Sequence, residues 1–370
     1  MRTARGNPSQ NVLLVGLRGV GKTVLLDRIR QDAESAGIHT VRVESPEKRS
    51  LPALLAPQLR LALIRLSKLE QARELAGRGL AALAGFAKAL KLKYHDIEVG
   101  IDVAAQAGLA DNGDLEHDLS ALLEAVGEAA QAAKTAVVLF IDELQYVPEE
   151  QLAALIAALH RAAQRKLPVL LVGAGLPQLR ANMGQAKSYS ERLFTYPLVD
   201  ALDPKAAADA LVIPAAQLGV SFTPGAIGKI VNHTKGYPYF LQEWGKQAWD
   251  AADASPITED DVAEATALTI AKLDESFFRV RFDRLTPAER RYMWAMAELG
   301  PGPHRSGDIA DKLGRGVTAL GPTRSKLIVK GMVWSPAHGD TAFTVPLFDE
   351  FMRRTLGTYE APAGLKGTGA

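Results

Sequence analysis

Between residues 11 and 200, short apolar runs alternate with stretches of helical periodicity. Continuous apolar runs at 12–15, 136–141 and 167–172 predict buried strands, and the alternating segment 38–43 predicts another. Between them, Leu, Ile and Ala recur at helical spacing, which predicts helices over 24–36, 51–68, 71–91, 114–134 and 148–166. Strands that alternate with helices indicate an α/β fold, in which helices flank a parallel sheet and ligands bind at the carboxyl ends of the strands.

Beyond a short predicted strand near 196–199 the pattern becomes helical, over 203–254 and 258–278, and its character changes at Arg279. The remaining segments predict helices at 286–299, 306–313 and 318–330, strands at 332–336 and 341–345, and a last helix at 348–354. The helix at 286 begins T-P-A-E, a capping box with proline at its first position. Three helices followed by a hairpin predict a winged helix-turn-helix.

These patterns divide the chain into successive domains. We expect a disordered start at 1–10, a core at 11–200 with a helical insertion at about 46–114, a helical lid at 201–284, a winged helix at 285–356 and a flexible tail at 357–370. The insertion is rich in basic residues, namely Arg60, Arg65, Lys68, Arg73, Arg78, Lys88, Lys91 and Lys93, and includes a weak hairpin pattern at 94–103. This basic face is either a solvated helix surface or a docking surface for nucleic acid or an acidic partner.

Composition limits the remaining possibilities. The 370 residues suggest two or three domains, and 47% hydrophobic with 23% charged residues is ordinary for a globular protein. The absence of cysteine excludes thiol catalysis, disulfides and cysteine zinc sites. No apolar run approaches the ~18 residues that span a bilayer, and residues 1–10 lack a signal-peptide core, so we expect a cytoplasmic protein without membrane contact. A net charge of +1 means that any nucleic-acid surface must be local.

The segment between the first strand and the first helix has the form G-x-x-x-x-G-K-T. Its glycines allow successive N–H groups to surround a phosphate at the N-terminus of a helix. Lys22 would contact the β- and γ-phosphates of ATP, and Thr23 would hold Mg²⁺. The predicted nucleotide-binding residues of this loop are Gly16, Leu17, Arg18, Gly19, Val20, Gly21, Lys22, Thr23 and Val24. The alternative is a plain glycine-rich turn between strand and helix.

Two acidic residues follow the apolar run 136–141. At the carboxyl end of a central parallel strand, Asp142 would help to hold Mg²⁺ through water, and Glu143 would polarise the water that attacks the γ-phosphate. Paired acids after a strand also occur as helix caps. The phosphate loop favours the catalytic interpretation, because both segments are expected at the same edge of the sheet.

Five motifs together resemble a known group. They are G-L-R-G-V-G-K-T at Gly16–Thr23, I-D-E-L-Q at Ile141–Gln145, G-A-G-L-P-Q-L at Gly173–Leu179, S-Y-S-E-R-L-F at Ser188–Phe194 and G-Y-P-Y-F-L at Gly236–Leu241. With the order of domains above, the chain resembles AAA+ P-loop ATPases of the origin-recognition type and the neighbouring STAND signalling ATPases, over about residues 11–355. The resemblance implies Walker A and Walker B motifs, ATP and Mg²⁺ as ligands, and ATP hydrolysis.

The resemblance also assigns residues outside those two motifs. Arg192 matches the arginine finger, which acts on the nucleotide of a neighbouring subunit and implies a homo-oligomer; alternatively it pairs with a carboxylate of its own subunit. Gly236 and Pro238 match a lid element that rests against adenine; alternatively Pro238 only starts a helix. The polar sensor expected after the fourth strand is replaced by Gly173–Gly175, which leaves Gln178 as the nearest candidate. The lid has Tyr239 where an arginine is usual, so a slow ATPase that acts as a switch fits best.

The predicted winged helix carries more basic than acidic residues. The candidate DNA-binding residues on or before its recognition helix are Arg315, Thr318, Thr323, Arg324, Lys326 and Lys330. The basic ones would contact phosphates, and Thr323 and Arg324 would reach base edges of double-stranded DNA. Winged helices of STAND proteins are, alternatively, packing modules. Two hypotheses follow: a DNA-associated ATPase that couples nucleotide state to DNA through this domain, or a STAND-like switch that acts on a protein partner the sequence does not identify.

Overall fold

The computed structural model describes residues 10–45, 49–90 and 110–356. The chain forms two compact units, one of Met1–Gly16 with Lys22–Val199 and one of Leu17–Gly21 with Asp200–Ala370. No helix among the described residues is both long enough and apolar enough to cross a membrane. We describe each unit by itself.

The first unit is built on a five-stranded parallel sheet of order β2-β3-β4-β1-β5. Its strands are β1 (Asn11–Val15), β2 (His39–Glu44), β3 (Val137–Asp142), β4 (Val169–Gly175) and β5 (Phe194–Thr195). Four of them confirm the predicted strands. The fifth pairs with β1 at 194–195 rather than at 196–199, where only an isolated bridge joins Leu198 to Val15. In this register Val15 lies opposite Gly175, and Glu44 opposite Asp142.

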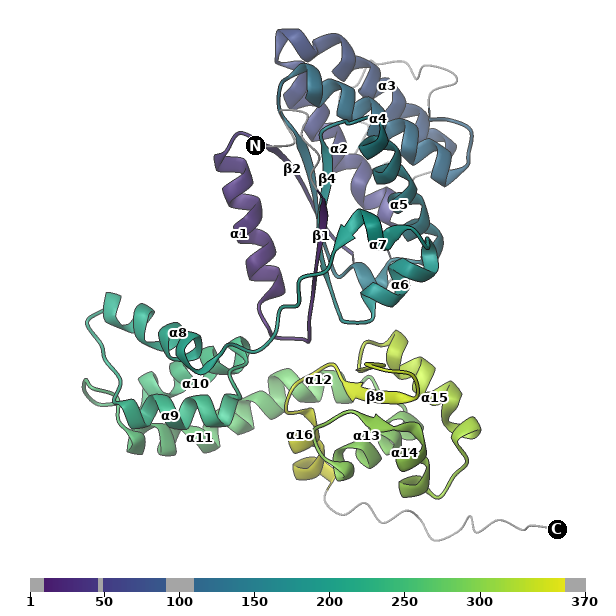
Figure 1. The fold of residues 1–370 in the computed structure, drawn as a ribbon. Helices are drawn as coiled ribbons and strands as arrows, with labels where there is room; N and C mark the ends of the chain where they lie inside the picture. Colours follow the sequence, from purple (N-terminus) through teal and green to yellow (C-terminus); the bar gives the residue numbers. More distant parts are fainter. Residues whose placement is uncertain (1–9, 46–48, 91–109, 357–370) are drawn as a thin grey trace, which may run out of the picture. The chain divides into compact units, whose positions relative to one another are not determined.

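Helices cover both faces of this sheet (Figure 1). On one face lies α1 (Lys22–Ser35), whose Leu26 packs with Leu14 and Phe140. The opposite face is covered by α2 (Leu51–Ser67), α4 (Leu115–Ala132) and α5 (Glu149–Gln164), and α3 (Arg73–Ala89) packs on α2 and α4. Short helices complete the unit: 3₁₀ turns at Glu70–Ala72 and Leu144–Tyr146, α6 (Leu179–Ala186) and α7 (Ser190–Leu193).

The basic insertion is part of this core. Leu59, Leu63 and Phe86 from α2 and α3 are fully buried in the same cluster as Leu139 of β3. Most of its basic side chains are exposed, namely Arg65, Lys68, Arg73, Arg78 and Lys88, whereas Arg60 is half-buried. Lys91, Lys93 and the hairpin expected at 94–103 lie outside the described residues. The apolar faces of α2 and α3 are therefore used for packing, and their basic faces point away from the core.

The second unit begins with helices α8 (Pro204–Gln217), α9 (Pro224–Thr234), α10 (Pro238–Ala251) and α11 (Glu259–Leu273). A π-helical turn, Asp274–Phe278, then leads directly into α12 (Arg279–Phe282). The chain thus stays helical past Arg279, beyond the end of the helical pattern predicted at 258–278. Phe278 stacks on Phe351 with 5.2 Å between ring centroids, and Phe282 packs edge-on against the same ring, so burial of these aromatic side chains keeps the chain helical past that point.

The unit ends with four helices and a small antiparallel sheet of order β6-β8-β7. The elements are α13 (Pro287–Leu299), β6 (His304–Arg305), α14 (Ser306–Leu313), α15 (Val317–Val329), β7 (Val333–Trp334), β8 (Asp340–Phe343) and α16 (Phe348–Leu356). The capping box predicted at the start of α13 is confirmed, because the Thr286 and Glu289 side chains each accept from the other's backbone N–H. Strand β6 was not predicted, since two residues are too few to show a period.

Candidate nucleotide-binding site

The loop between β1 and α1 has the backbone geometry of a phosphate cradle. Gly19 and Gly21 adopt φ of +79° and +87°, backbone angles that residues other than glycine rarely adopt. The Lys22 side chain is buried, and its amine donates a 3.0 Å hydrogen bond to the carbonyl of Gly16. Because α1 begins at Lys22, the positive end of the helix dipole lies next to this amine. The loop therefore presents several positive groups to an anion.

Thr23 and Asp142 bring the loop and the end of β3 together. The exposed Thr23 hydroxyl donates a 2.6 Å hydrogen bond to Oδ2 of Asp142, which is buried. The other carboxylate oxygen, Oδ1, accepts the backbone N–H of Glu143 at 2.8 Å. A hydroxyl and a carboxylate in contact are oxygen ligands of the kind that Mg²⁺ prefers. The donor set thus fits this ion.

Glu143 follows in a left-handed backbone conformation, with φ of +55°. Non-glycine residues in this region are uncommon and occur where the surrounding structure enforces them. Although Glu143 precedes a 3₁₀ turn, its carboxylate does not cap that turn. Instead, its Oε2 accepts a hydrogen bond from Nε2 of Gln145. The helix-cap interpretation is therefore wrong for this carboxylate.

A further group of charges lines a narrow hollow beside Thr23 and Asp142. Arg30 donates to Asp27 at 2.9 Å, and Arg42 lies 3.5 Å from the same carboxylate. The hydrogen bond from Arg30 lowers the pKa of Asp27 below its usual range. Asp27 is thus an ionised partner of two arginines next to the Thr23 hydroxyl.

Arg192 and Gln178 both lie in the first unit, but Arg192 is exposed whereas Gln178 has a buried amide oxygen. Arg192 lies on the short helix α7 and is exposed; its backbone N–H donates to the carbonyl of Tyr189, but its side chain makes no hydrogen bond or ion pair with any residue that the structure describes. The ion pair within its own subunit is therefore not observed among those residues.

Gln178 stands just before α6, and its Oε1 is buried without a hydrogen-bond partner in the described part of the chain. A buried polar atom left in this way calls for a ligand or a water molecule.

Gly236 and Pro238 belong to the second unit and shape the connection between α9 and α10. Gly236 has φ of +76°, and a Cβ at this position would lie 2.3 Å from the carbonyl oxygen of Leu202. Its own carbonyl accepts the N–H of Leu202 at 2.9 Å. Pro238 is the first residue of α10, where its missing N–H costs no hydrogen bond. Both residues have a structural reason to be present, and their predicted contact with adenine stays a prediction.

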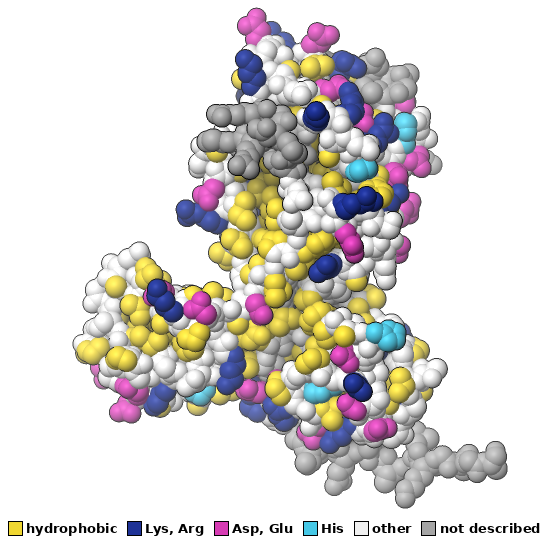
Figure 2. Space-filling view, in the orientation of Figure 1, with side chains coloured by type: hydrophobic (Ala, Val, Ile, Leu, Met, Phe, Trp, Pro, Cys, Tyr) yellow, Lys and Arg dark blue, Asp and Glu magenta, His cyan; other side chains and the backbone are white. Residues whose placement is uncertain are grey.

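The six candidate DNA-binding residues divide into two groups. The Arg324 guanidinium donates to Thr341 Oγ1 at 2.7 Å, to Ser335 Oγ at 2.8 Å and to the carbonyl of Asp340 at 2.7 Å. The Lys330 amine bonds Glu289 at 2.7 Å. By contrast, Arg315, Thr318 and Lys326 are exposed, and Thr323 is half-buried. Figure 2 shows Lys and Arg interspersed with Asp and Glu on the visible face, rather than a continuous surface of one sign.

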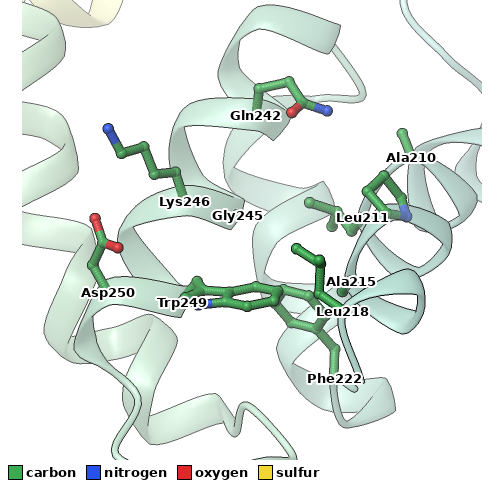
Figure 3. Close-up of a pocket in the computed structure, with 11 residues that line it drawn as sticks. Ala210, Leu211, Ala215, Leu218, Phe222, Gln242, Gly245, Lys246, Trp249 and Asp250 are labelled. Carbon is green, nitrogen blue, oxygen red and sulfur yellow. The ribbon is translucent and has the colours of Figure 1, made fainter. Parts of the chain in front are cut away.

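The second unit also contains an apolar cavity of about 290 Å³ between α8 and α10 (Figure 3). Trp249, Phe222 and Leu218 lie together on one side of it, and Gln242, Lys246 and Asp250 bring the polar side chains. Pro214 lines it too, and because proline has no N–H it cannot donate to the carbonyl of Ala210 one turn earlier. None of the predicted nucleotide-binding residues lines this cavity.

Sequence patterns alone assigned no role to two polar residues of the first unit, Asn11 and Gln145. Asn11 accepts the N–H of Leu171 at 2.7 Å and donates to the carbonyl of Leu193 at 3.3 Å, so one buried amide joins β1 to β4 and to the end of α7. Gln145 is the last residue of the motif I-D-E-L-Q, and the sequence predicted no contact for it. A polar residue two positions after Glu143 was the available signal, but its contacts depend on the neighbouring strand.

A parallel sheet with this loop between β1 and α1, and paired acids at the end of β3, defines the class of P-loop nucleotide-binding proteins. Residues 1–172 match the family described as AAA ATPase domain, so this part of the chain is similar to AAA ATPase cores. Residues 275–352 match a family described as a domain of unknown function, DUF8462. No curated protein matches the sequence.

Solved structures are similar to this chain at low sequence identity. A Walker-type ATPase of Pyrococcus abyssi is 16% identical, with a TM-score of 0.57 over 95% of each chain. The RuvB Holliday junction branch migration motor of Thermotoga maritima is 17% identical, with a TM-score of 0.45 over 98% of this chain and 91% of its own. The ORC1 protein of Aeropyrum pernix, solved with DNA, is 16% identical, with a TM-score of 0.44 over 96% and 89%. The last two scores are too low to support an argument.

Proposed function

We propose that the protein binds Mg²⁺–ATP at the loop Gly16–Thr23 and hydrolyses it slowly, as a nucleotide-dependent switch. The observation that carries the proposal is the contact between Thr23 and Asp142, since it joins the loop to the acidic end of β3. Lys22 would bind the β- and γ-phosphates, and Thr23 and Asp142 would hold the metal ion. Bound Mg²⁺ would neutralise negative charge on the phosphates.

In this proposal Glu143 orients the attacking water and accepts its proton. The carboxylate is half-buried and, with Asp142, stands at the carboxyl end of β3, where parallel sheets place ligands. Slow turnover is supported by the glycines at 173 and 175, which leave this end of β4 without a polar side chain.

The test is a comparison of Lys22→Ala and Glu143→Gln with the wild-type protein. Lys22→Ala should weaken ATP binding at least about tenfold, because hydrogen bonds to charged groups contribute roughly 1.5–3 kcal/mol. Glu143→Gln should keep ATP affinity and lower kcat by about 10²–10⁴-fold, as expected for loss of a general base. Lys88→Ala, an exposed lysine on α3, is the control. Unchanged affinity in Lys22→Ala would refute the proposal.

A second candidate function is association with double-stranded DNA through the domain at 285–356, interpreted as a winged helix. The exposed side chains of Arg315, Thr318 and Lys326 at α14–α15 favour it. Since Arg324 and Lys330 are bonded within their own unit, the test uses Arg315→Ala and Lys326→Ala. DNA affinity measured across a salt series should lose about one unit of slope for each lost phosphate contact. Equal slopes in all variants favour the other hypothesis, a STAND-like switch that acts on a protein partner.

A further inference from the structure

The Gln145 amide connects the proposed catalytic carboxylate to the end of β4. Its Nε2 donates to Oε2 of Glu143, and its Oε1 accepts the backbone N–H of Leu176 at 3.0 Å. The second bond settles the orientation of the amide, because a backbone N–H can only donate and must face the oxygen. The amide nitrogen is therefore turned toward Glu143.

The glycine at 175 makes room for this side chain. A Cβ at Gly175 would lie 2.7 Å from Oε1 of Gln145 and 2.7 Å from Cδ2 of Leu179. At Gly173 a Cβ would meet Leu144 and Leu13 at 2.4 and 2.7 Å. Neither glycine has a positive φ, so the reason for glycine here is space rather than backbone conformation. The segment in which a polar sensor was expected carries no polar side chain, and Gln145 fills the space beside Gly175.

The same strand end touches the phosphate loop. The N–H of Gly16 donates to the carbonyl of Gly175 at 3.3 Å, and the carbonyl of Gly16 accepts the amine of Lys22. A chain of hydrogen bonds therefore joins Glu143 to Lys22. It runs from Glu143 to Gln145 and Leu176, then along the backbone to Gly175, and from there through Gly16 to Lys22. The Glu143 carboxylate makes no bond to the turn that follows it, so the bond from Gln145 sets its direction.

We propose that Gln145 is the positioning residue of Glu143, and that its amide supplies, from the 3₁₀ turn after β3, the polar group that β4 lacks at Gly173–Gly175. The inference rests on the proposed function, since it needs Glu143 to activate water. Gln145 itself touches neither nucleotide nor water in this role. It sets the direction of the carboxylate and ties that direction to the strand end beside the phosphate loop.

The experiment measures kcat, KM, ATP affinity and thermal unfolding for Gln145→Ala and Gln145→Glu. Each removes the donor to Glu143, and each should lower kcat about tenfold or more while ATP affinity and unfolding temperature change little. Gln131→Ala, an exposed glutamine on α4, is the matched control and should behave as wild type. Equal losses of kcat, affinity and unfolding temperature would indicate a merely structural role and overturn the inference.

Two double variants separate positioning from other effects. In a Glu143→Gln background, Gln145→Ala should not lower the residual turnover further, because Gln145 acts only through Glu143. Gly175→Ser should lower kcat in the wild-type background by displacing Gln145, and should have a smaller effect once Gln145 is alanine. Additive effects in both cycles would overturn the inference.

The outcomes also distinguish this inference from the proposed function. If Glu143→Gln lowers turnover but Gln145→Ala does not, the proposed function stands and the role of Gln145 is refuted. If the wild-type protein shows no ATP turnover, or Glu143→Gln leaves kcat unchanged, the proposed role of Glu143 fails and the inference fails with it.

Discussion

The Thr23 hydroxyl lies 2.6 Å from Oδ2 of Asp142, although 119 residues separate them in the chain. This contact places two oxygen-bearing side chains side by side at the carboxyl edge of the sheet. Since Thr23 is an exposed residue and Asp142 a buried one, the pair is open from the side of Thr23. Preformed ligands of this kind reduce the entropy lost on binding an ion.

Replacing Thr23 should separate metal-dependent from metal-independent ATP binding. Thr23→Ala removes the hydroxyl, so ATP affinity in the presence of Mg²⁺ should fall about tenfold, in the range for one hydrogen bond to a charged group. Affinity measured by calorimetry with a chelator should not change. Thr23→Ser keeps the hydroxyl and should retain most of the affinity. An equal loss with and without Mg²⁺ would show that Thr23 serves the loop rather than the ion.

Arg192 should act on a neighbouring subunit if it is an arginine finger. Turnover per subunit should then rise with protein concentration in the wild-type protein and stay flat and low in Arg192→Ala, because a finger stabilises transition-state charge by about 10³–10⁵-fold. Arg78→Ala, which removes another exposed arginine, is the control. Turnover independent of concentration in the wild-type protein would count against action in trans.

Arg324 should be important for stability whether or not DNA binds. Its guanidinium connects α15 to Ser335 and to the β8 residues Asp340 and Thr341, of which Thr341 is fully buried. Arg324→Ala should lower the free energy of unfolding by about 2 kcal/mol, because the buried Thr341 hydroxyl loses its charged donor. Lys326→Ala, at an exposed position, should stay within about 0.5 kcal/mol of wild type. Urea denaturation with circular dichroism measures both, and equal stability of the two variants would refute this role.

Glu289 should make the stability of its domain depend on pH. Burial opposes ionisation of this carboxyl, but hydrogen bonds from Lys330 and Thr286 outweigh it and lower its pKa. A lowered pKa means that the ionised form stabilises the fold: the contribution is complete above the ordinary Glu value of about 4.3 and is lost as pH falls through the lowered pKa.

The variant Glu289→Gln tests this dependence. At neutral pH it should be less stable by about 2 kcal/mol, since one partner of a largely buried pair is lost while Lys330 keeps access to solvent. The difference from wild type should shrink in acid, as measured by unfolding between neutral pH and the acid range. Glu350→Gln, which alters an exposed carboxylate, is the control. A difference that is constant with pH would refute the assignment.

The sequence by itself determined the features that arise from short stretches of chain. The positive φ values of Gly19 and Gly21, the capping box of Thr286 with Glu289, and four of the five core strands all agree with it. Glycine is required wherever the backbone turns left, caps depend on residues three apart, and buried strands need continuous apolar runs. Each of these properties is local, so each can be recognised from composition and spacing.

Only the tertiary structure decided which distant residues meet. It carried the helix through Arg279, because Phe278 and Phe282 pack on Phe351. It bonded Arg324 within its own unit and placed the Gln145 amide between Glu143 and Leu176. Such contacts depend on strand order, register and the space left by glycines on neighbouring strands. A residue's type shows that it can form a hydrogen bond, but the packing of segments far apart in the chain selects its partner.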